Sequence, residues 1–282
     1  MIYKEILNPL LSEPLAIRDS NNLLMVRRIS FIYHSLRELD LQLKEMGSLL
    51  IVKYGFSSEI IPELVKKLNI KNLVCSSDYE PSAISRDLKI KNIIKENGVN
   101  FISVKDQCIF EKKEILSKSN TPYTVFTPYK NSWMKKFFLM GSLDSNYKKK
   151  DLSQKILQFT KNENFLLPSF QEMGFSNENS LPLEIKCGSS GARFHLKKFL
   201  NIINSYKLNR DFPALSGTSH LSIHLRFGTI SIRMLIKEVL GKNQETLTEG
   251  SETWLSELVW REFYMQILFN FPHVSKGCFK KH

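Results

Sequence analysis

Between Met25 and Lys105, short apolar runs alternate with stretches of helical periodicity. The spacing predicts helices over residues 30–46, 59–68 and 82–96, and strands over residues 49–54, 72–76 and 99–104. Such βαβ alternation is typical of a parallel sheet with helices on its faces. We therefore predict an α/β domain with a Rossmann-like parallel sheet over residues 1–137. No GxGxxG motif follows any of these strands, so the sequence of this half gives no support for dinucleotide binding.

The second half of the chain has a different pattern. After Ser189 the strand-like alternation ends, and helical periodicity predicts an all-α domain over residues 189–282. Its helices are predicted over residues 193–206, 220–227, 232–240 and 252–270. Residues 138–188, which are rich in Ser, Asn and Lys and include the run Lys148 to Lys150, are predicted to be an interdomain linker.

Charge and cysteine usage narrow the functional class. Lys and Arg number 40 against 28 Asp and Glu, a formal net charge of +12, which favours nucleic acid or an anionic cofactor as partner. No apolar run is long enough for a membrane span or a signal peptide, so we predict a cytoplasmic protein with no membrane partner. The four cysteines lack CxxC spacing and are predicted to be free thiols in the core. They are Cys75, Cys108, Cys187 and Cys278.

The segment from Gly217 to Ser222 combines three hydroxyl side chains with the predicted start of a helix. Unpaired backbone N–H groups and the helix dipole favour a phosphate there. An ordinary Ser/Thr helix cap would satisfy the same N–H groups without a ligand. Arg210 is open to two similar interpretations, because it can contact a phosphate or pair with Asp211. We predict no metal site, since His220 and His224 lie one turn apart but lack an acidic third ligand.

A second group of residues lies on the last predicted helix. On a helical wheel, one arc holds Trp254, Glu257, Trp260, Arg261 and Tyr264. Indoles beside a carboxylate suit a planar aromatic ligand, because the rings stack and the carboxylate accepts a hydrogen bond from a ring N–H. The alternative is a Glu257–Arg261 salt bridge on a helix that buries two tryptophans.

Several segments together resemble the DNA photolyase and cryptochrome family. They are YKLNRDFPALSGTSHLS (206–222), HLRFGTISIR (224–233) and WLSELVWREFY (254–264). Upstream, DYEP (78–81) with SRD (85–87), and YTVFTPYKNSW (123–133), look like the antenna-domain and interdomain patterns of the same family. The resemblance covers most of the chain and implies an N-terminal α/β antenna domain followed by a helical FAD-binding domain.

The resemblance implies a deoxyribodipyrimidine photolyase, a carbon–carbon lyase that repairs cyclobutane pyrimidine dimers by light-driven electron transfer from reduced FAD. The damaged bases would be flipped out of the duplex, with Glu257 hydrogen-bonding them and Trp260 stacking on them. The implied FAD contacts are Tyr206, Thr218, Ser219, His220, Leu221, Ser222 and Trp254. The implied DNA contacts are Arg210, Glu257, Leu258, Val259, Trp260, Arg261, Glu262, Phe263 and Tyr264.

The sequence also departs from the family pattern. The first βα unit of the antenna domain is missing, and the chain ends soon after the predicted lesion-pocket helix. We therefore expect an incomplete FAD domain, which is inactive alone or completed by a second polypeptide. A folate or deazaflavin antenna is possible by resemblance, but Ser82 and Ala83 replace the Asn-Glu pair of folate-binding members. The alternatives are a cryptochrome-type blue-light photoreceptor and a non-catalytic DNA-binding fragment.

Overall fold

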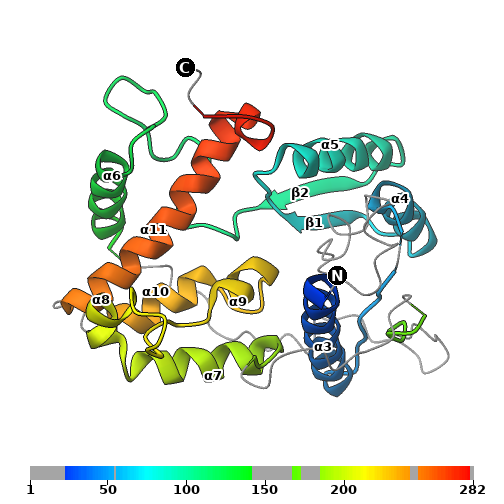
Figure 1. Cartoon of the computed structure of the whole chain (residues 1–282). Helices are drawn as coiled ribbons and strands as arrows, with labels where there is room; N and C mark the ends of the chain where they lie inside the picture. The colour runs from blue at the N-terminus through cyan, green and yellow to red at the C-terminus, as the bar shows by residue number, and fades with distance from the viewer. Residues whose placement is uncertain (1–22, 54, 142–166, 173–184, 242–246, 280–282) are drawn as a thin grey trace.

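The computed structural model describes residues 23–53, 55–141, 167–172, 185–241 and 247–279. A small parallel sheet with its helices lies on one side of the molecule, and a group of helices lies on the other (Figure 1). The elements of the first part are α3 (Leu23–Glu45), α4 (Ser57–Lys67), β1 (Asn72–Ser76), α5 (Pro81–Glu96), β2 (Asn100–Val104) and α6 (Phe126–Leu139). The second part contains α7 (Gly188–Leu200), η1 (Ile203–Ser205), α8 (Tyr206–Asn209), α9 (Ser222–Phe227), α10 (Ile232–Leu240), α11 (Glu249–Asn270) and η2 (Pro272–Ser275).

The sheet forms by a β1–α5–β2 crossover. Strands β1 and β2 pair in parallel, from Asn72 opposite Asn100 to Ser76 opposite Val104. Helix α5 begins with Pro81 in its first turn, where proline costs no intrahelical hydrogen bond. A small core joins α4, α5 and the sheet, made of Ile61, Val65, Leu73, Ile90, Ile94 and Val99. The predicted α/β architecture followed by helices is confirmed.

The predicted strand over residues 49–54 is wrong for its described part. Residues 49–53 form no strand, although Ile51 is buried as an apolar run requires. The Leu50 N–H donates to Asp40 Oδ1 of α3 at 3.3 Å. Within the described ranges, β1 pairs with β2 alone. A strand needs a neighbouring ladder, which an apolar run cannot supply by itself.

The helical part follows the predicted order with shifted ends. Helix α7 ends at Leu200 and the chain continues through η1 and α8, where one continuous helix to residue 206 was predicted. Helix α9 begins at Ser222 because His220 has a left-handed backbone (φ 53°), which a helix cannot include. Helix α11 begins at Glu249, after Thr248 Oγ1 accepts a hydrogen bond from the Ser251 N–H.

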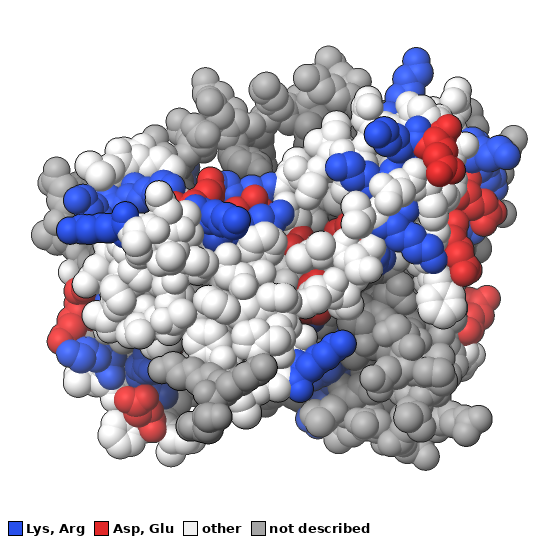
Figure 2. All heavy atoms as spheres, turned by 90° about the horizontal axis from the view of Figure 1, so that it is seen from above, with Lys and Arg blue, Asp and Glu red and all other residues white. Residues whose placement is uncertain are grey.

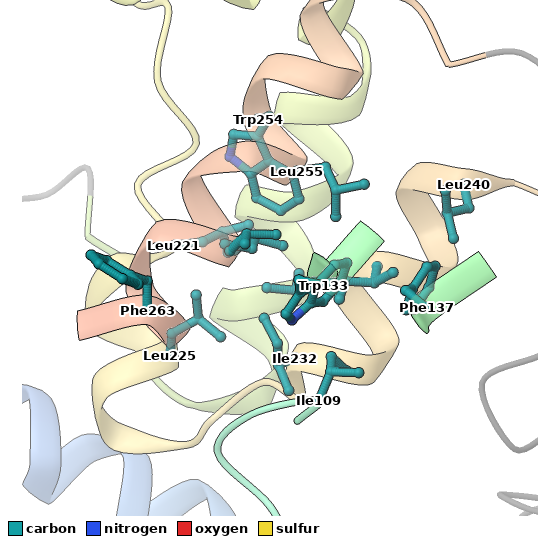
Figure 3. Close-up of a cluster of buried hydrophobic side chains, with 14 of the residues drawn as sticks. Ile109, Trp133, Phe137, Leu221, Leu225, Ile232, Leu240, Trp254, Leu255 and Phe263 are labelled. Carbon is teal, nitrogen blue, oxygen red and sulfur yellow. The ribbon is translucent and has the colours of Figure 1, made fainter. Parts of the chain in front are cut away.

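Helix α6 has no counterpart in the sequence prediction, although its buried residues Tyr129, Trp133 and Phe137 recur at helical spacing. These side chains pack against α11 in the main core, which also includes Ile109 (Figure 3). The boundary at residue 137 between the two predicted domains stays a prediction. In the structure, residues from 109 to 137 share a core with the helical part.

Helix α3 is attached to the helical part by Glu38. Its carboxylate accepts hydrogen bonds from Ser189 Oγ at 2.7 Å, Ser190 Oγ at 2.6 Å and the Ser190 N–H at 3.0 Å. Gly188 makes this approach possible, since a Cβ there would lie 2.5 Å from Glu38 Cδ. The first turn of α7 is therefore capped by a carboxylate from a distant helix.

The sequence also led to predictions about the cysteines, membrane-spanning helices, metal ligands and the interdomain linker. All four cysteines are unbridged, but the prediction that they lie in the core is confirmed only for Cys108. Cys75 and Cys187 are partly exposed, and Cys278, which follows η2, is exposed. No helix in the described part is long and apolar enough to cross a membrane. The same residues hold no group of three potential metal ligands. Most of the predicted linker, including Lys148 to Lys150, lies outside the described residues.

Candidate functional site

The five side chains predicted to share one arc of α11 do not have the same environment, since some lie in the core and others at the surface. Trp254 is 4% exposed and packs beside Phe199, with ring centroids 5.2 Å apart (Figure 3). Glu257 and Trp260 are partly exposed, and Tyr264 is 62% exposed. Positions 257, 260 and 264 follow one another at i, i+3 and i+7, so these three side chains share an outward stripe of the helix.

Trp260 lies at the centre of an aromatic cluster. Its indole is stacked flat on Phe126 of α6, with centroids 3.5 Å apart and an interplanar angle of 8°. Tyr264 stacks at 5.5 Å and 23°, and Phe263 meets the indole edge-on at 5.7 Å. The sequence prediction included the other three rings but missed Phe126. Only the packing of α6 on α11 brings it here.

Glu257 forms an ion pair with Arg210, which follows α8. Arg210 Nε also contacts Asp211 Oδ1 at 3.3 Å, and its guanidinium lies over the Tyr206 ring at 5.6 Å. The hydrogen bond with Glu257 raises the pKa of Arg210. The alternative of a Glu257–Arg261 salt bridge is therefore wrong, because α8 brings a nearer cation to the carboxylate. Both interpretations of Arg210 stay open, since its pair with Asp211 does not bury it.

Arg261 points away from this surface. Its Nη1 donates to the Gln107 carbonyl oxygen at 2.6 Å, and burial lowers the pKa of its guanidinium. Gln107 belongs to the loop that follows β2, so Arg261 joins α11 to the sheet part. This placement does not support a position between DNA and a cofactor.

Glu262 is buried and cannot reach DNA. At 2% exposure, it accepts hydrogen bonds from the Ile109 N–H at 2.7 Å, the Phe110 N–H at 2.9 Å and Trp133 Nε1 at 2.7 Å. Burial raises the pKa of this carboxyl to about 7, although the three donors favour its charged form. Three further side chains predicted to face DNA are also in the core, namely Leu258, Val259 and Phe263. Their role in this structure is packing.

Close backbone contact brings the segment before α9 next to α8. A Cβ on Gly217 would lie 2.7 Å from Asn209 Cβ and 2.8 Å from the Asn209 carbonyl oxygen. Only glycine allows this approach. Tyr206, at the start of α8, packs edge-on against Phe199, the residue that also contacts Trp254. The predicted cofactor residues on α8, α11 and the segment 217–222 therefore belong to one region.

The residues of this segment differ in what they offer a ligand. Ser219 Oγ accepts a hydrogen bond from the Leu221 N–H at 3.4 Å, in the turn before α9. The N-cap residue of α9 is Leu221, which makes no side-chain cap hydrogen bond, so the alternative of an ordinary Ser/Thr helix cap is wrong for this helix. Leu221 is buried in the core (Figure 3). Thr218, His220 and Ser222 are exposed. The hydroxyls of Thr218 and Ser222 are thus available to a ligand, whereas Leu221 can contribute only its backbone.

Two histidines lie behind the segment. His224 is fully buried, with Nδ1 2.7 Å from Thr229 Oγ1, and His195 lies 5.5 Å away by ring centroids. Burial lowers the pKa of His224 to about 4 and also lowers that of His195. His224 is therefore neutral near pH 7 and supplies no positive charge to the segment.

Basic residues are not gathered into a single strip on the face shown in Figure 2. Lys and Arg lie on both sides of this face with Asp and Glu among them. The surplus of basic residues therefore favours anionic partners in general and marks no single path for a nucleic acid there.

Residues 14–148 match the family model described as DNA photolyase. The chain is similar to a deoxyribodipyrimidine photo-lyase of Synechococcus sp., with 29% identity over 262 residues, which is 90% of this chain and 53% of the relative. It is also similar to the deoxyribodipyrimidine photo-lyase of Escherichia coli, with 27% identity over 89% of this chain and 52% of the relative. The chain spans about half the length of these curated relatives.

Solved structures give the same similarity. A bacterial class III photolyase from Agrobacterium tumefaciens superposes with a TM-score of 0.66 at 26% identity, over 87% of this chain and 50% of that one. A Synechocystis cryptochrome superposes with a TM-score of 0.69 at 17% identity, over 86% of this chain and 50% of the cryptochrome.

Proposed function

We propose that this chain, which is similar to photolyases over most of its length, takes part in light-driven repair of cyclobutane pyrimidine dimers in DNA. One observation carries the proposal. The outward stripe of α11 places a carboxylate, Glu257, beside an indole, Trp260, with the guanidinium of Arg210 paired to the carboxylate. A stripe that only faced water would need no partly exposed indole held by other rings.

Each of these side chains has a role that its geometry supports. Bases taken out of a duplex are bound by stacking on aromatic rings and by hydrogen bonds to their Watson–Crick edge. Trp260 provides the stacking surface. Glu257 accepts a hydrogen bond from a ring N–H of the base, at a position that the ion pair with Arg210 holds. Arg210 is partly exposed beside this carboxylate, so its remaining N–H donors can contact a DNA phosphate.

The residues present fit an FAD molecule at its pyrophosphate end. Thr218 and Ser222 offer exposed hydroxyls, and the first N–H groups of α9 have no partner within that helix. Tyr206 and Trp254 lie mainly in the core, so they would border the cofactor mostly with their edges. When bound, FAD would supply the absorption of light and the electron that opens the cyclobutane ring. The chain's own residues would bind the anion and orient the damaged bases.

The test uses the purified 282-residue chain. Flavin absorbance after desalting, with and without added FAD, measures cofactor retention. An oligonucleotide that carries one thymine dimer then measures repair under blue light, with darkness and the Trp260→Ala variant as controls. Flavin retention with light-dependent repair that Trp260→Ala reduces supports the proposal. Flavin retention without repair would instead favour a cryptochrome-type photoreceptor, and the absence of both would favour a non-catalytic DNA-binding chain.

A further inference from the structure

Phe126 covers one face of the Trp260 indole. The two rings are nearly parallel, at 8°, and their centroids are 3.5 Å apart, the closest ring pair of the cluster. At this distance the phenyl ring excludes water and any other ring from the face that it covers. Phe126 also meets Phe263 edge-on at 5.8 Å, so its own plane is fixed from a second side.

The position of Phe126 is fixed by the rest of α6. Phe126, Tyr129 and Trp133 are spaced by three and four residues, so they share one face of the helix. Tyr129 packs on Phe263 of α11 at 5.1 Å, and Trp133 Nε1 donates to Glu262 of α11 at 2.7 Å. Three successive contacts therefore fix α6 along α11, and the outermost of them is the Phe126–Trp260 stack.

We propose that Phe126 is a positioning residue for Trp260, which rests on the proposed function of Trp260 as the stacking surface for a damaged base. Phe126 holds the indole in one orientation, so that a base can contact only the part of the indole that Phe126 does not cover. A free indole would lose rotational freedom on binding, and a held indole has already lost it. Phe126 does not touch the base in this account and acts only through Trp260.

The first experiment measures the orientation of Trp260 without DNA. The chain has three tryptophans, so ¹⁹F NMR of the 5-fluorotryptophan-labelled protein gives three resonances, and Trp260→Phe assigns one of them. Phe126→Leu should shift and broaden the Trp260 resonance and leave that of Trp254 unchanged. Phe137→Leu is a matched control, because Phe137 stacks on Trp133 of the same helix at 4.9 Å and 11°. It should move the Trp133 resonance alone.

The second experiment measures the consequence for binding. Affinity is compared for a single-stranded oligonucleotide with one thymine dimer and for its undamaged equivalent, with each variant corrected for its folded fraction. Phe126→Leu should weaken dimer binding about three- to tenfold. Phe126→Tyr, which keeps the ring, should restore it, and Phe137→Leu should leave it unchanged.

The two experiments separate the two proposals. If the unaltered chain does not prefer the dimer, the proposed function fails, and the Trp260 resonance still decides whether Phe126 orients the indole. An unchanged Trp260 resonance in Phe126→Leu would overturn the positioning role. Tighter dimer binding by Phe126→Leu would also overturn it, because Phe126 would then occupy the place of the base.

Discussion

Two carboxylates on α11 show how burial assigns roles to neighbouring residues. Glu257 and Glu262 are five positions apart on one helix. Glu257 is partly exposed and pairs with a cation, whereas Glu262 is buried and accepts three hydrogen bonds. The first is available to a ligand, and the second holds the loop after β2. Their residue type alone does not distinguish them.

The raised pKa of Glu262 predicts a pH-dependent stability. Because its pKa rises from 4.5 to about 7 on burial, the folded chain binds this proton more tightly than the unfolded chain. Its contribution to stability is therefore complete below pH 4.5 and is lost as the pH rises to 7, by on the order of 3 kcal/mol. Urea unfolding measures the difference in unfolding free energy between the unaltered chain and Glu262→Gln. This difference should decrease between pH 5 and pH 8. A difference that stays constant would contradict this assignment.

A Glu257→Gln substitution should separate binding from stability. The Arg210–Glu257 pair is partly exposed, so its loss should cost less than about 1 kcal/mol of unfolding free energy. Loss of the charge-assisted acceptor should weaken binding of a dimer-containing oligonucleotide by about tenfold. Thermal unfolding and fluorescence anisotropy measure the two effects. Arg226→Gln breaks the Arg226–Glu80 pair at another exposed position and is a control that should change neither.

At the scale of elements, close helix contacts determine where the site residues lie. Helix α11 approaches η1 at Gly250, where a Cβ would lie 2.6 Å from the Asn204 carbonyl oxygen. Helix α6 lies beside the middle of α11 and brings Phe126 to Trp260 (Figure 1). The outward stripe of α11 therefore depends on glycine at one contact and on aromatic rings at the other.

Gly250→Ala should destabilise the chain by about 1–3 kcal/mol. The added methyl group meets backbone carbonyl oxygens of η1, which cannot move aside as a flexible side chain can. Gly277→Ala is the matched control, because nothing lies within 4 Å of its Cβ position and it should stay within about 0.5 kcal/mol of the native chain. Urea denaturation of both variants checks this, and equal stabilities would show that α11 can shift without cost.

At the scale of the whole molecule, the sheet part is attached to the helical part through the loop after β2. Side chains of α10 and α11 satisfy its backbone groups. Arg233 donates to the Asp106 and Cys108 carbonyl oxygens, and Arg261 donates to the Gln107 carbonyl oxygen. Glu262 accepts from the next two N–H groups of the loop. The two parts are therefore joined by hydrogen bonds from side chain to backbone.

Arg233→Leu should loosen this attachment. It leaves two carbonyl oxygens without their charged donor, at a cost of about 1–3 kcal/mol. Hydrogen exchange of the loop amides at residues 109 and 110 should accelerate, while exchange in the centre of α5 should not. Arg226→Leu, which breaks one exposed ion pair to Glu80, should leave the exchange of the loop unchanged. Equal exchange in both variants would contradict the role of Arg233.

The sequence by itself determined the elements whose signals are local. Periodicity identified β1 over residues 72–76 and α10 over residues 232–240 with the bounds that the structure has. The motif over residues 254–264 predicts that α11 carries the site. Such signals need only neighbouring residues, because helix and strand repeats are set by the backbone. Tertiary structure alone decided that residues 49–53 form no strand, that Glu257 pairs with Arg210, and that Phe126 stacks on Trp260. These outcomes depend on contacts between segments far apart in the chain, where burial and the nearest partner decide each role.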